Sequence, residues 1–185
     1  MRIISGKAGS IPLRVPKSLT RPTTDRVREA MFSALGDIVI GANVLDLFAG
    51  SGSLGIESLS RGATSVTFVE SNDAACKVIT GNLEKANLKG GKVMRQNVSS
   101  YLSRTSPGEF DIIFADPPYA RDDGTREALH SLLDNGSPQR ALKDDGIFVL
   151  ESLASDPLPE MPLWKTVKEK TYGTTRVSYL VAIRP

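Results

Sequence analysis

The chain has 185 residues, of which 40% are apolar and 24% charged; this is one domain's length and excludes a disordered or fibrous protein. No stretch approaches the roughly 18 apolar residues of a membrane-spanning helix, and one cysteine with one histidine excludes disulfides and Cys- or His-rich metal sites. The net charge is +2, but residues 1–28 hold seven basic residues and one acidic residue. We therefore expect a cytoplasmic protein without a metal, whose basic N-terminal part faces a polyanion or is simply solvated.

The first elements predict an N-terminal extension over residues 1–36. Arg2–Ile4 and Ile11–Val15 read as two short strands around a Gly/Ser-rich turn, with prolines typical of an edge hairpin. Apolar residues at helical spacing then predict a helix that Thr24 or Asp25 caps and that ends at residue 36.

From residue 37 to residue 185, strands alternate with helices. The predicted strands are Val44–Phe48, Ser65–Glu70, Lys92–Arg95, Phe110–Ala115, Gly146–Glu151, Lys165–Thr171 and Thr175–Ile183. The predicted helices are 53–61, 73–87 and 123–134. Such alternation predicts an α/β fold with a mostly parallel sheet of about seven strands, the last two strands forming an antiparallel hairpin. Ligands of such sheets bind at the carboxyl ends of the strands.

A glycine-rich loop follows the first strand of this sheet. Gly50, Gly52 and Gly55 form a GxGxxG pattern, and Glu70 ends the next strand 20 residues after Gly50, placed to accept hydrogen bonds from a ribose. Both a dinucleotide and S-adenosyl-L-methionine fit this spacing. Asp46 favours S-adenosyl-L-methionine, because a carboxylate is unfavourable beside a pyrophosphate but favourable beside the ammonium group of the methionine part.

The string from Val44 to Gly52 is similar to the first motif of Rossmann-like methyltransferases. We assign cofactor contacts to residues of this string and to the acidic residue after it: Asp46, Phe48, Gly50, Ser51, Gly52 and Glu70. Asn97 follows the third strand, where these enzymes often have an aspartate that contacts the adenine amino group, and the Asn97 carbonyl can also accept that bond.

Asp116-Pro117-Pro118-Tyr119 follows the fourth strand and predicts the catalytic site. The prolines remove two N–H donors, which leaves a stiff loop rich in acceptors. If Asp116 and the Pro117 carbonyl each accept one N–H of a base amine, the nitrogen lone pair becomes available to the methyl group. Tyr119 offers a flat face on which the flipped base stacks.

Three segments together resemble the RsmD-type ribosomal RNA methyltransferases: Arg21–Glu29, Val44–Gly55 and Asp116–Tyr119. The resemblance implies a class I methyltransferase that uses S-adenosyl-L-methionine to methylate N2 of one guanine in 16S ribosomal RNA. It implies a small ribosomal subunit, complete or partly assembled, as the substrate. On their own physical reading, Arg21, Arg26 and Arg28 either contact RNA phosphates or are solvated next to a capped helix.

Three alternatives stay open at this point. The first keeps the chemistry but methylates adenine N6 or cytosine N4 on DNA or another RNA, since Asp-Pro-Pro-Tyr does not separate these amines. The second is a nucleotide-sensing or RNA-binding module without catalysis. The third is a dinucleotide-dependent oxidoreductase.

Overall fold

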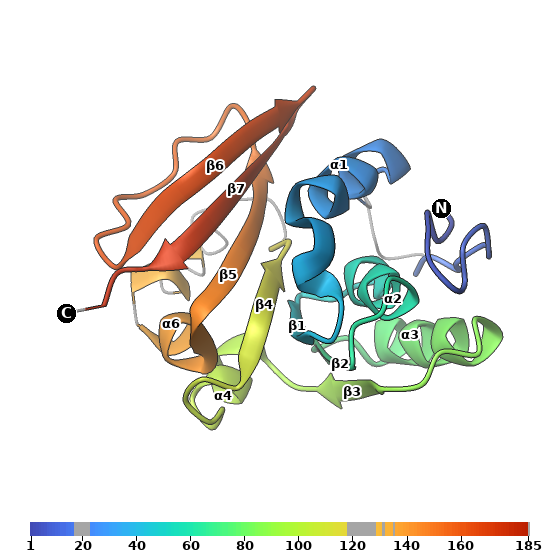
Figure 1. Ribbon diagram of the computed structural model, residues 1–185. Helices are drawn as coiled ribbons and strands as arrows, with labels where there is room; N and C mark the ends of the chain where they lie inside the picture. The colour runs from blue at the N-terminus through green and yellow to red at the C-terminus, as the bar shows by residue number, and fades with distance from the viewer. Residues whose placement is uncertain (17–22, 118–128, 131, 135, 185) are drawn as a thin grey trace. The chain divides into compact units, whose positions relative to one another are not determined.

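The computed structural model describes residues 1–16, 23–117, 129–130, 132–134 and 136–184. The chain divides into two compact units, Met1–Val98 and Ser99–Pro185 (Figure 1). Residues 1–36, which we expected as an extension, are part of the first unit and do not form a unit of their own. Within the described ranges, no helix is long and apolar enough to cross a membrane.

In the first unit, the part of the chain that the structure describes forms three parallel strands in the order β3-β2-β1, with helices packed on them. In chain order its elements are α1 (Asp25–Leu35), the 3₁₀ helix η1 (Gly36–Val39), β1 (Asn43–Leu47), α2 (Ser53–Ser60), β2 (Ser65–Glu70), α3 (Asp73–Lys85) and β3 (Gly91–Arg95). All eight residues of α2 are buried. Helix α2 packs closely on β2, since a Cβ at Gly55 would lie 2.3 Å from the Phe68 ring.

The described residues of the second unit form four strands in the order β4-β5-β7-β6. Its elements are α4 (Val98–Leu102), β4 (Phe110–Ala115), α6 (Ser137–Ala141), β5 (Leu142–Leu153), β6 (Trp164–Tyr172) and β7 (Thr175–Ala182). Strands β4 and β5 are parallel, whereas β7 pairs antiparallel with both β5 and β6. The solid apolar run of β4 is buried, as expected of a central parallel strand.

The seven strands confirm the predicted fold class, a mostly parallel α/β sheet with an antiparallel C-terminal hairpin. Strands β2 and β4 have the predicted bounds, and the other five differ at one or both ends. Helices η1, α4 and α6 are short and were not predicted. Of the helix expected over residues 123–134, residues 129–130 and 132–134 are helical, and the others lie outside the described residues.

The predicted N-terminal hairpin forms only in part: the Ile3 N–H donates to the Ile11 carbonyl oxygen at 2.9 Å and the Leu13 N–H to the Met1 carbonyl oxygen at 3.2 Å, but the pairing does not extend into two strands. Arg2 and Pro12 form one isolated antiparallel bridge, and no strand is assigned in residues 1–16. The reason is that Ile4 and Ser5 donate their N–H groups to the Glu57 carboxylate of α2 and not to a neighbouring strand. Pro12 also lacks the N–H group that a longer ladder needs.

Candidate active site

The glycine loop between β1 and α2 is a tight left-handed turn. Phe48, Gly50 and Gly52 have φ angles of 56°, 53° and 75°, and the Gly52 N–H donates to the Ala49 carbonyl oxygen at 2.6 Å. Positive φ is uncommon for a residue with a side chain such as Phe48. A Cβ at Gly52 would lie 3.0 Å from Ile79 of α3, so the loop backbone lies directly against that helix.

Asp46 lies in β1 just before this loop and is buried, with 2% of its surface exposed. Its Oδ2 accepts the Gly55 N–H of α2 at 2.9 Å, which ties the strand to the helix after the loop. The pKa of Asp46 is raised to about 7, chiefly by burial; the Gly55 hydrogen bond works against this rise, and the nearby charge of Glu70 adds to it. The carboxyl group therefore titrates near neutral pH, and a cation beside it would favour its charged form.

Glu70 ends β2 and connects it to the glycine loop. Its Oε2 accepts the Gly50 N–H at 2.9 Å, and its Oε1 accepts the Asn72 N–H at 2.8 Å. Asn72 in turn caps α3 by accepting the Ala75 N–H. Each carboxylate oxygen has a second lone pair, so Glu70 retains acceptor capacity for hydroxyl donors. A ribose beside Gly50 is the kind of group that this arrangement suits.

Asn82 of α3 is a residue at this site that the sequence analysis missed. Its side chain is fully buried, and its Nδ2 donates to the Ser51 carbonyl oxygen at 3.1 Å and to the Arg14 carbonyl oxygen at 3.0 Å. Its Oδ1 accepts the Arg14 N–H at 2.8 Å. Asn82 thus joins the N-terminal segment to the glycine loop. The available signal was a polar residue three positions after Ile79, on the apolar face of the helix.

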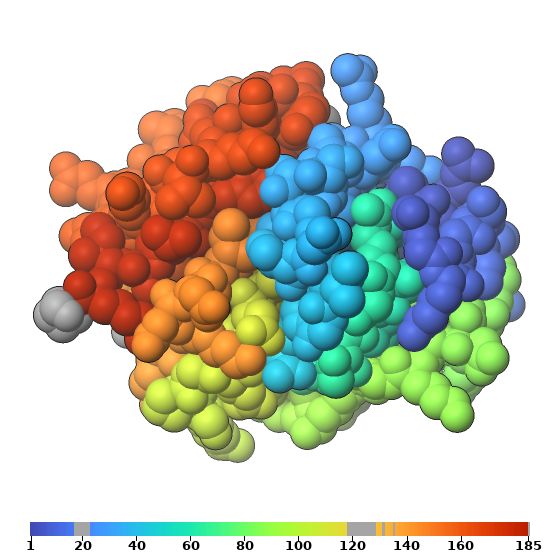
Figure 2. All heavy atoms as spheres, viewed as in Figure 1, coloured from blue at the N-terminus to red at the C-terminus, as the bar shows by residue number. Residues whose placement is uncertain are grey.

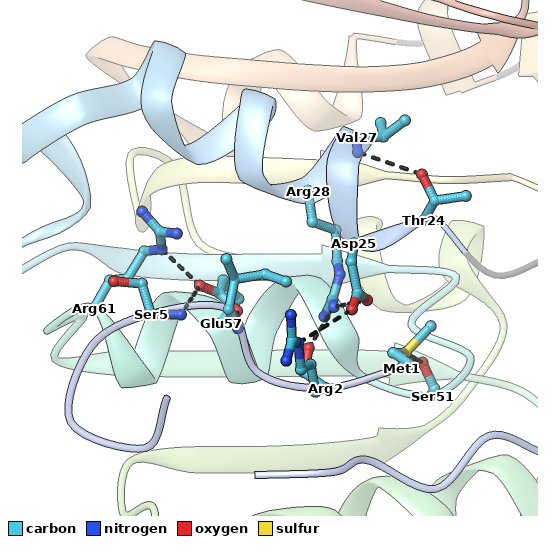
Figure 3. Close-up of polar contacts among 11 residues, drawn as sticks. Met1, Arg2, Ser5, Thr24, Asp25, Val27, Arg28, Ser51, Glu57 and Arg61 are labelled. Atoms are coloured by element: carbon cyan, nitrogen blue, oxygen red, sulfur yellow. Dashed lines mark hydrogen bonds and ion pairs between the residues drawn. The ribbon is translucent and has the colours of Figure 1, made fainter. Parts of the chain in front are cut away.

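Ser51, one of the predicted cofactor residues, is itself buried beneath the N-terminus. Its Oγ lies 3.6 Å from the Met1 Sδ, at the right of Figure 3. The N-terminal segment, dark blue in Figure 2, covers the surface of α2 and α3 on this side. Lys85 of α3 adds a bond of 2.7 Å to the Pro12 carbonyl oxygen. The segment up to Arg14 is therefore fastened to the unit and is not an independent basic arm.

Glu57 of α2 is a second residue that holds the N-terminal segment in place, and its side chain is fully buried. Figure 3 shows its contacts. Its carboxylate accepts the Ile4 N–H at 2.7 Å and the Ser5 N–H at 3.1 Å, and it forms an ion pair of 2.7 Å with Arg61. The Arg61 guanidinium lies over the Phe32 ring of α1, 4.9 Å from its centroid. A buried carboxylate with this many partners holds residues 4–5 in one position.

We expected three arginines to contact RNA, and the structure excludes such a contact for one of them, Arg28. Its side chain is fully buried in α1, where Nη2 donates to the Arg2 carbonyl and, at 2.7 Å, to Asp25, as Figure 3 shows. A buried guanidinium is not available to a phosphate, so the expectation for Arg28 is corrected to a structural role. Arg26 is exposed, and Arg21 lies outside the described residues. Thr24 caps α1 as expected, since it accepts the Val27 N–H.

The second unit carries the predicted amine-binding motif at the end of β4. Asp116 is half-buried directly after the strand, and Pro117 is buried. Pro118 and Tyr119 lie outside the described residues, so the stacking role of Tyr119 stays a prediction. Asn97 belongs to the first unit and is exposed between β3 and α4, which is compatible with contact to a ligand at that strand end.

Cys76 of α3 is buried, and its Sγ lies 3.5 Å from the Glu70 carbonyl oxygen. Burial, with the charges of Glu70 and Asp73, raises the pKa of this thiol. Its thiolate is therefore disfavoured, and the cysteine is a core residue and not a nucleophile.

The mostly parallel sheet and the glycine loop after β1 define a Rossmann-like fold of the class I methyltransferase type. The chain belongs to the family described as Conserved hypothetical protein 95, whose model matches residues 1–181. It is 37% identical over 175 residues to Ribosomal RNA small subunit methyltransferase D of Escherichia coli (strain K12), covering 94% of this chain and 85% of that protein.

A relative of the same name from Haemophilus influenzae is 34% identical, and the match covers 97% of this chain and 91% of that protein. Among solved structures, an Escherichia coli protein, yhhF, described provisionally as a methyltransferase, superposes with a TM-score of 0.79 at 34% identity. That match covers 98% of this chain and 97% of the other. These matches confirm the RsmD-type resemblance of the sequence motifs.

Proposed function

We propose that this protein transfers a methyl group from S-adenosyl-L-methionine to the exocyclic N2 of one guanine in 16S ribosomal RNA. Its substrate is the small ribosomal subunit or an assembly intermediate in the cytoplasm. The observation that carries the proposal is the match, over nearly the whole chain, to relatives named Ribosomal RNA small subunit methyltransferase D. The acceptor residue at the end of β4, Asp116, supplies the chemistry that such a reaction needs.

The residues of the first unit fit S-adenosyl-L-methionine. Glu70 has acceptor capacity for the ribose hydroxyls, and the positive φ of Gly50 and Gly52 lets the backbone approach a ligand. Asp46 favours the methionine ammonium group, directly or through water, because the ammonium would offset the cost of its buried charge. When bound, this cofactor supplies an electrophilic methyl group on a sulfonium.

The residues of the second unit orient the amine that accepts the methyl group. Asp116 accepts one N–H of the guanine amine and the Pro117 carbonyl accepts the other, so the nitrogen becomes more pyramidal. The lone pair is then exposed for bond formation, and the nitrogen loses one proton after the methyl group is transferred. The negative charge of Asp116 stabilises the positive charge that develops on nitrogen, so this contact strengthens in the transition state.

The test is transfer of tritiated methyl groups from S-adenosyl-L-methionine to small subunits from a strain that lacks this activity, followed by nucleoside analysis. We expect N2-methylguanosine. If N6-methyladenosine or N4-methylcytidine forms in its place, the target is adenine N6 or cytosine N4 and not guanine N2. Absence of any methylated nucleoside would contradict the enzymatic proposal.

The role of Asp116 is tested in the same assay. We expect Asp116→Ala to lower the single-turnover rate about 100-fold, roughly 2.7 kcal/mol, with cofactor affinity within a few fold of wild type. Asp116→Asn is milder, since an amide oxygen still accepts one N–H. Asp145→Ala removes an exposed carboxylate of the same unit and is the matched control. A near-normal rate for Asp116→Ala would contradict the amine-orienting mechanism.

A further inference from the structure

The outer strand of the second unit, β6, carries three lysines whose arrangement depends on a β-bulge. Lys165, Lys168 and Lys170 are all exposed. In a regular strand, residues three apart face opposite sides, so Lys165 and Lys168 would be separated. The register shifts between Thr166 and Lys168, which leaves Val167 as the extra residue of the bulge.

The pairing with β7 shows that the bulge brings the three lysines to one face. Lys165, Lys168 and Lys170 pair with Val181, Tyr179 and Val177. These three residues of β7 alternate along a regular stretch and therefore share a face. The lysine row, defined as Lys165, Lys168 and Lys170, thus follows one side of the strand. The Lys168 Nζ lies 5.8 Å from the centroid of the Tyr179 ring, which helps to place it.

The acidic residue of β6 is on the other face. Glu169 pairs in register with Ser178, accepts a hydrogen bond of 3.1 Å from the Ser178 Oγ, and lies 3.8 Å from the Arg176 Nε. Among the residues that the structure describes, no carboxylate forms an ion pair with the lysine row. Positive and negative charges of the strand are therefore separated between its two faces.

The row also reaches the level of the proposed catalytic residue. Ala115 of β4 pairs with Leu150 of β5, Leu150 with Ser178 of β7, and Ser178 with Glu169 of β6. Strand β6 runs parallel to β4 (Figure 1). By the register given above, Lys170 therefore lies level with Asp116, the residue that follows Ala115. The separation is three strand spacings, about 14 Å. Roughly four stacked nucleotides span that distance at about 3.4 Å each.

We propose that the lysine row binds the phosphate backbone of ribosomal RNA beside the target guanine. The inference rests on the proposed function, because it takes Asp116 as the position of the target base. Evenly placed ammonium groups without interspersed carboxylates are complementary to a polyanion and carry no base specificity. The row therefore contributes affinity and position, while the amine that accepts the methyl group is bound at Asp116.

The test compares two variants that remove the same charge, one in each of the two units. Lys168→Gln/Lys170→Gln changes the row, and Lys89→Gln/Lys92→Gln changes two exposed lysines at and before β3. The probe is an unmodified transcript of 16S ribosomal RNA, with affinity measured over a series of salt concentrations. We expect the slope of log K against log salt to flatten by about 1.4–1.8 for the row variant only. Between about 50 and 200 mM salt, that difference corresponds to roughly 10-fold in affinity.

A third variant separates placement from net charge. Lys170→Gln/Thr171→Lys keeps the charge of the strand but moves it to the face of Glu169, since Thr171 pairs with Arg176. We expect the slope of log K against log salt to flatten in this variant by about half as much as in the double variant, because one lysine of the row is lost instead of two. It should raise the KM for RNA with little change in kcat. Restoration of the wild-type slope would show that placement does not matter and would overturn the proposal.

The two proposals fail separately. Absence of methyl transfer by the wild-type enzyme would contradict the proposed function. Wild-type transfer, together with equal slopes for the row variant and its control, would overturn the lysine row. If the row variant also self-associates with an unchanged slope, the lysines only protect a sheet edge against pairing with another chain, which equally overturns the proposal.

Discussion

At the scale of single residues, Asp46 is a carboxylate whose burial has a measurable consequence. Its pKa is about 7 in the folded chain, against an ordinary value of 3.8. Between these two pH values the folded chain holds a proton that the unfolded chain has already released. The free energy of unfolding therefore decreases as pH rises through this window, and the loss is complete above about pH 8.

We therefore expect Asp46→Asn to gain stability relative to wild type as pH rises from about 5 to 7, and the difference to be constant above about pH 8. The amide oxygen still accepts the Gly55 N–H and does not ionise. Urea unfolding of both proteins over this pH range measures the difference. A difference that is independent of pH would show that Asp46 is ionised in the folded chain throughout.

Glu70 is the residue on which cofactor affinity should depend most. We expect Glu70→Ala to weaken binding of S-adenosyl-L-methionine by about 1.5–3 kcal/mol, the size of a charge-assisted hydrogen bond. The Gly50 N–H also loses its acceptor in this variant, which loosens the glycine loop. Isothermal titration calorimetry is the measurement, and Glu84→Ala, an exposed glutamate of α3, is the control. Equal affinities of the two variants would contradict the assignment.

At the scale of elements, α2 receives the N-terminal segment on its C-terminal turn. Ser60 donates its Oγ–H to the Ser5 carbonyl at 2.5 Å and accepts the Ala8 N–H, and its carbonyl accepts the Lys7 N–H. Gly6 lies between these contacts with a φ of 82°, and a Cβ there would lie 2.0 Å from the Ser60 carbonyl oxygen. No side chain fits at Gly6 without moving the segment off the helix.

We expect Gly6→Ala to lower the free energy of unfolding by about 2–4 kcal/mol, because it adds backbone strain to a steric clash. Cofactor affinity should fall as well, since the displaced segment includes the Met1 and Arg14 contacts with Ser51 and Asn82. Gly9→Ala is the matched control: its Cβ would lie 3.4 Å from the nearest atom, and it should stay within about 1 kcal/mol of wild type. Equal stability of both variants would show that the segment is not held at Ser60.

At the scale of the whole molecule, ligand binding should appear as thermal stabilisation. S-adenosylhomocysteine at about 100 times its Kd adds roughly 2.7 kcal/mol, which raises the Tm of a chain of this length by about 5–10 °C. NAD at the same concentration should leave the Tm unchanged, since Asp46 disfavours a pyrophosphate. Differential scanning calorimetry separates the two ligands. A shift with NAD alone would favour the oxidoreductase alternative.

The sequence by itself determined the fold class and the approximate position of each of the seven strands. β2 and β4 have the bounds that their apolar runs indicate, and the Gly50–Gly52 turn was recognised between a strand and a helix. These features depend on backbone periodicity and on φ angles, which neighbouring residues encode. The family was recognised for the same reason, because its motifs are short and local.

Only the tertiary structure decided the partners of individual side chains. Arg28 was expected at RNA and is buried. Ile4 of the expected N-terminal strand donates to Glu57, and Asn82 binds Arg14, which lies 68 positions before it in the chain. The bulge of β6, which places Lys165 and Lys168 on one face, is likewise invisible in a pattern of charges. The physical reason is that hydrogen-bonding groups take whichever partner packing brings close, and that choice is made between segments distant in the sequence.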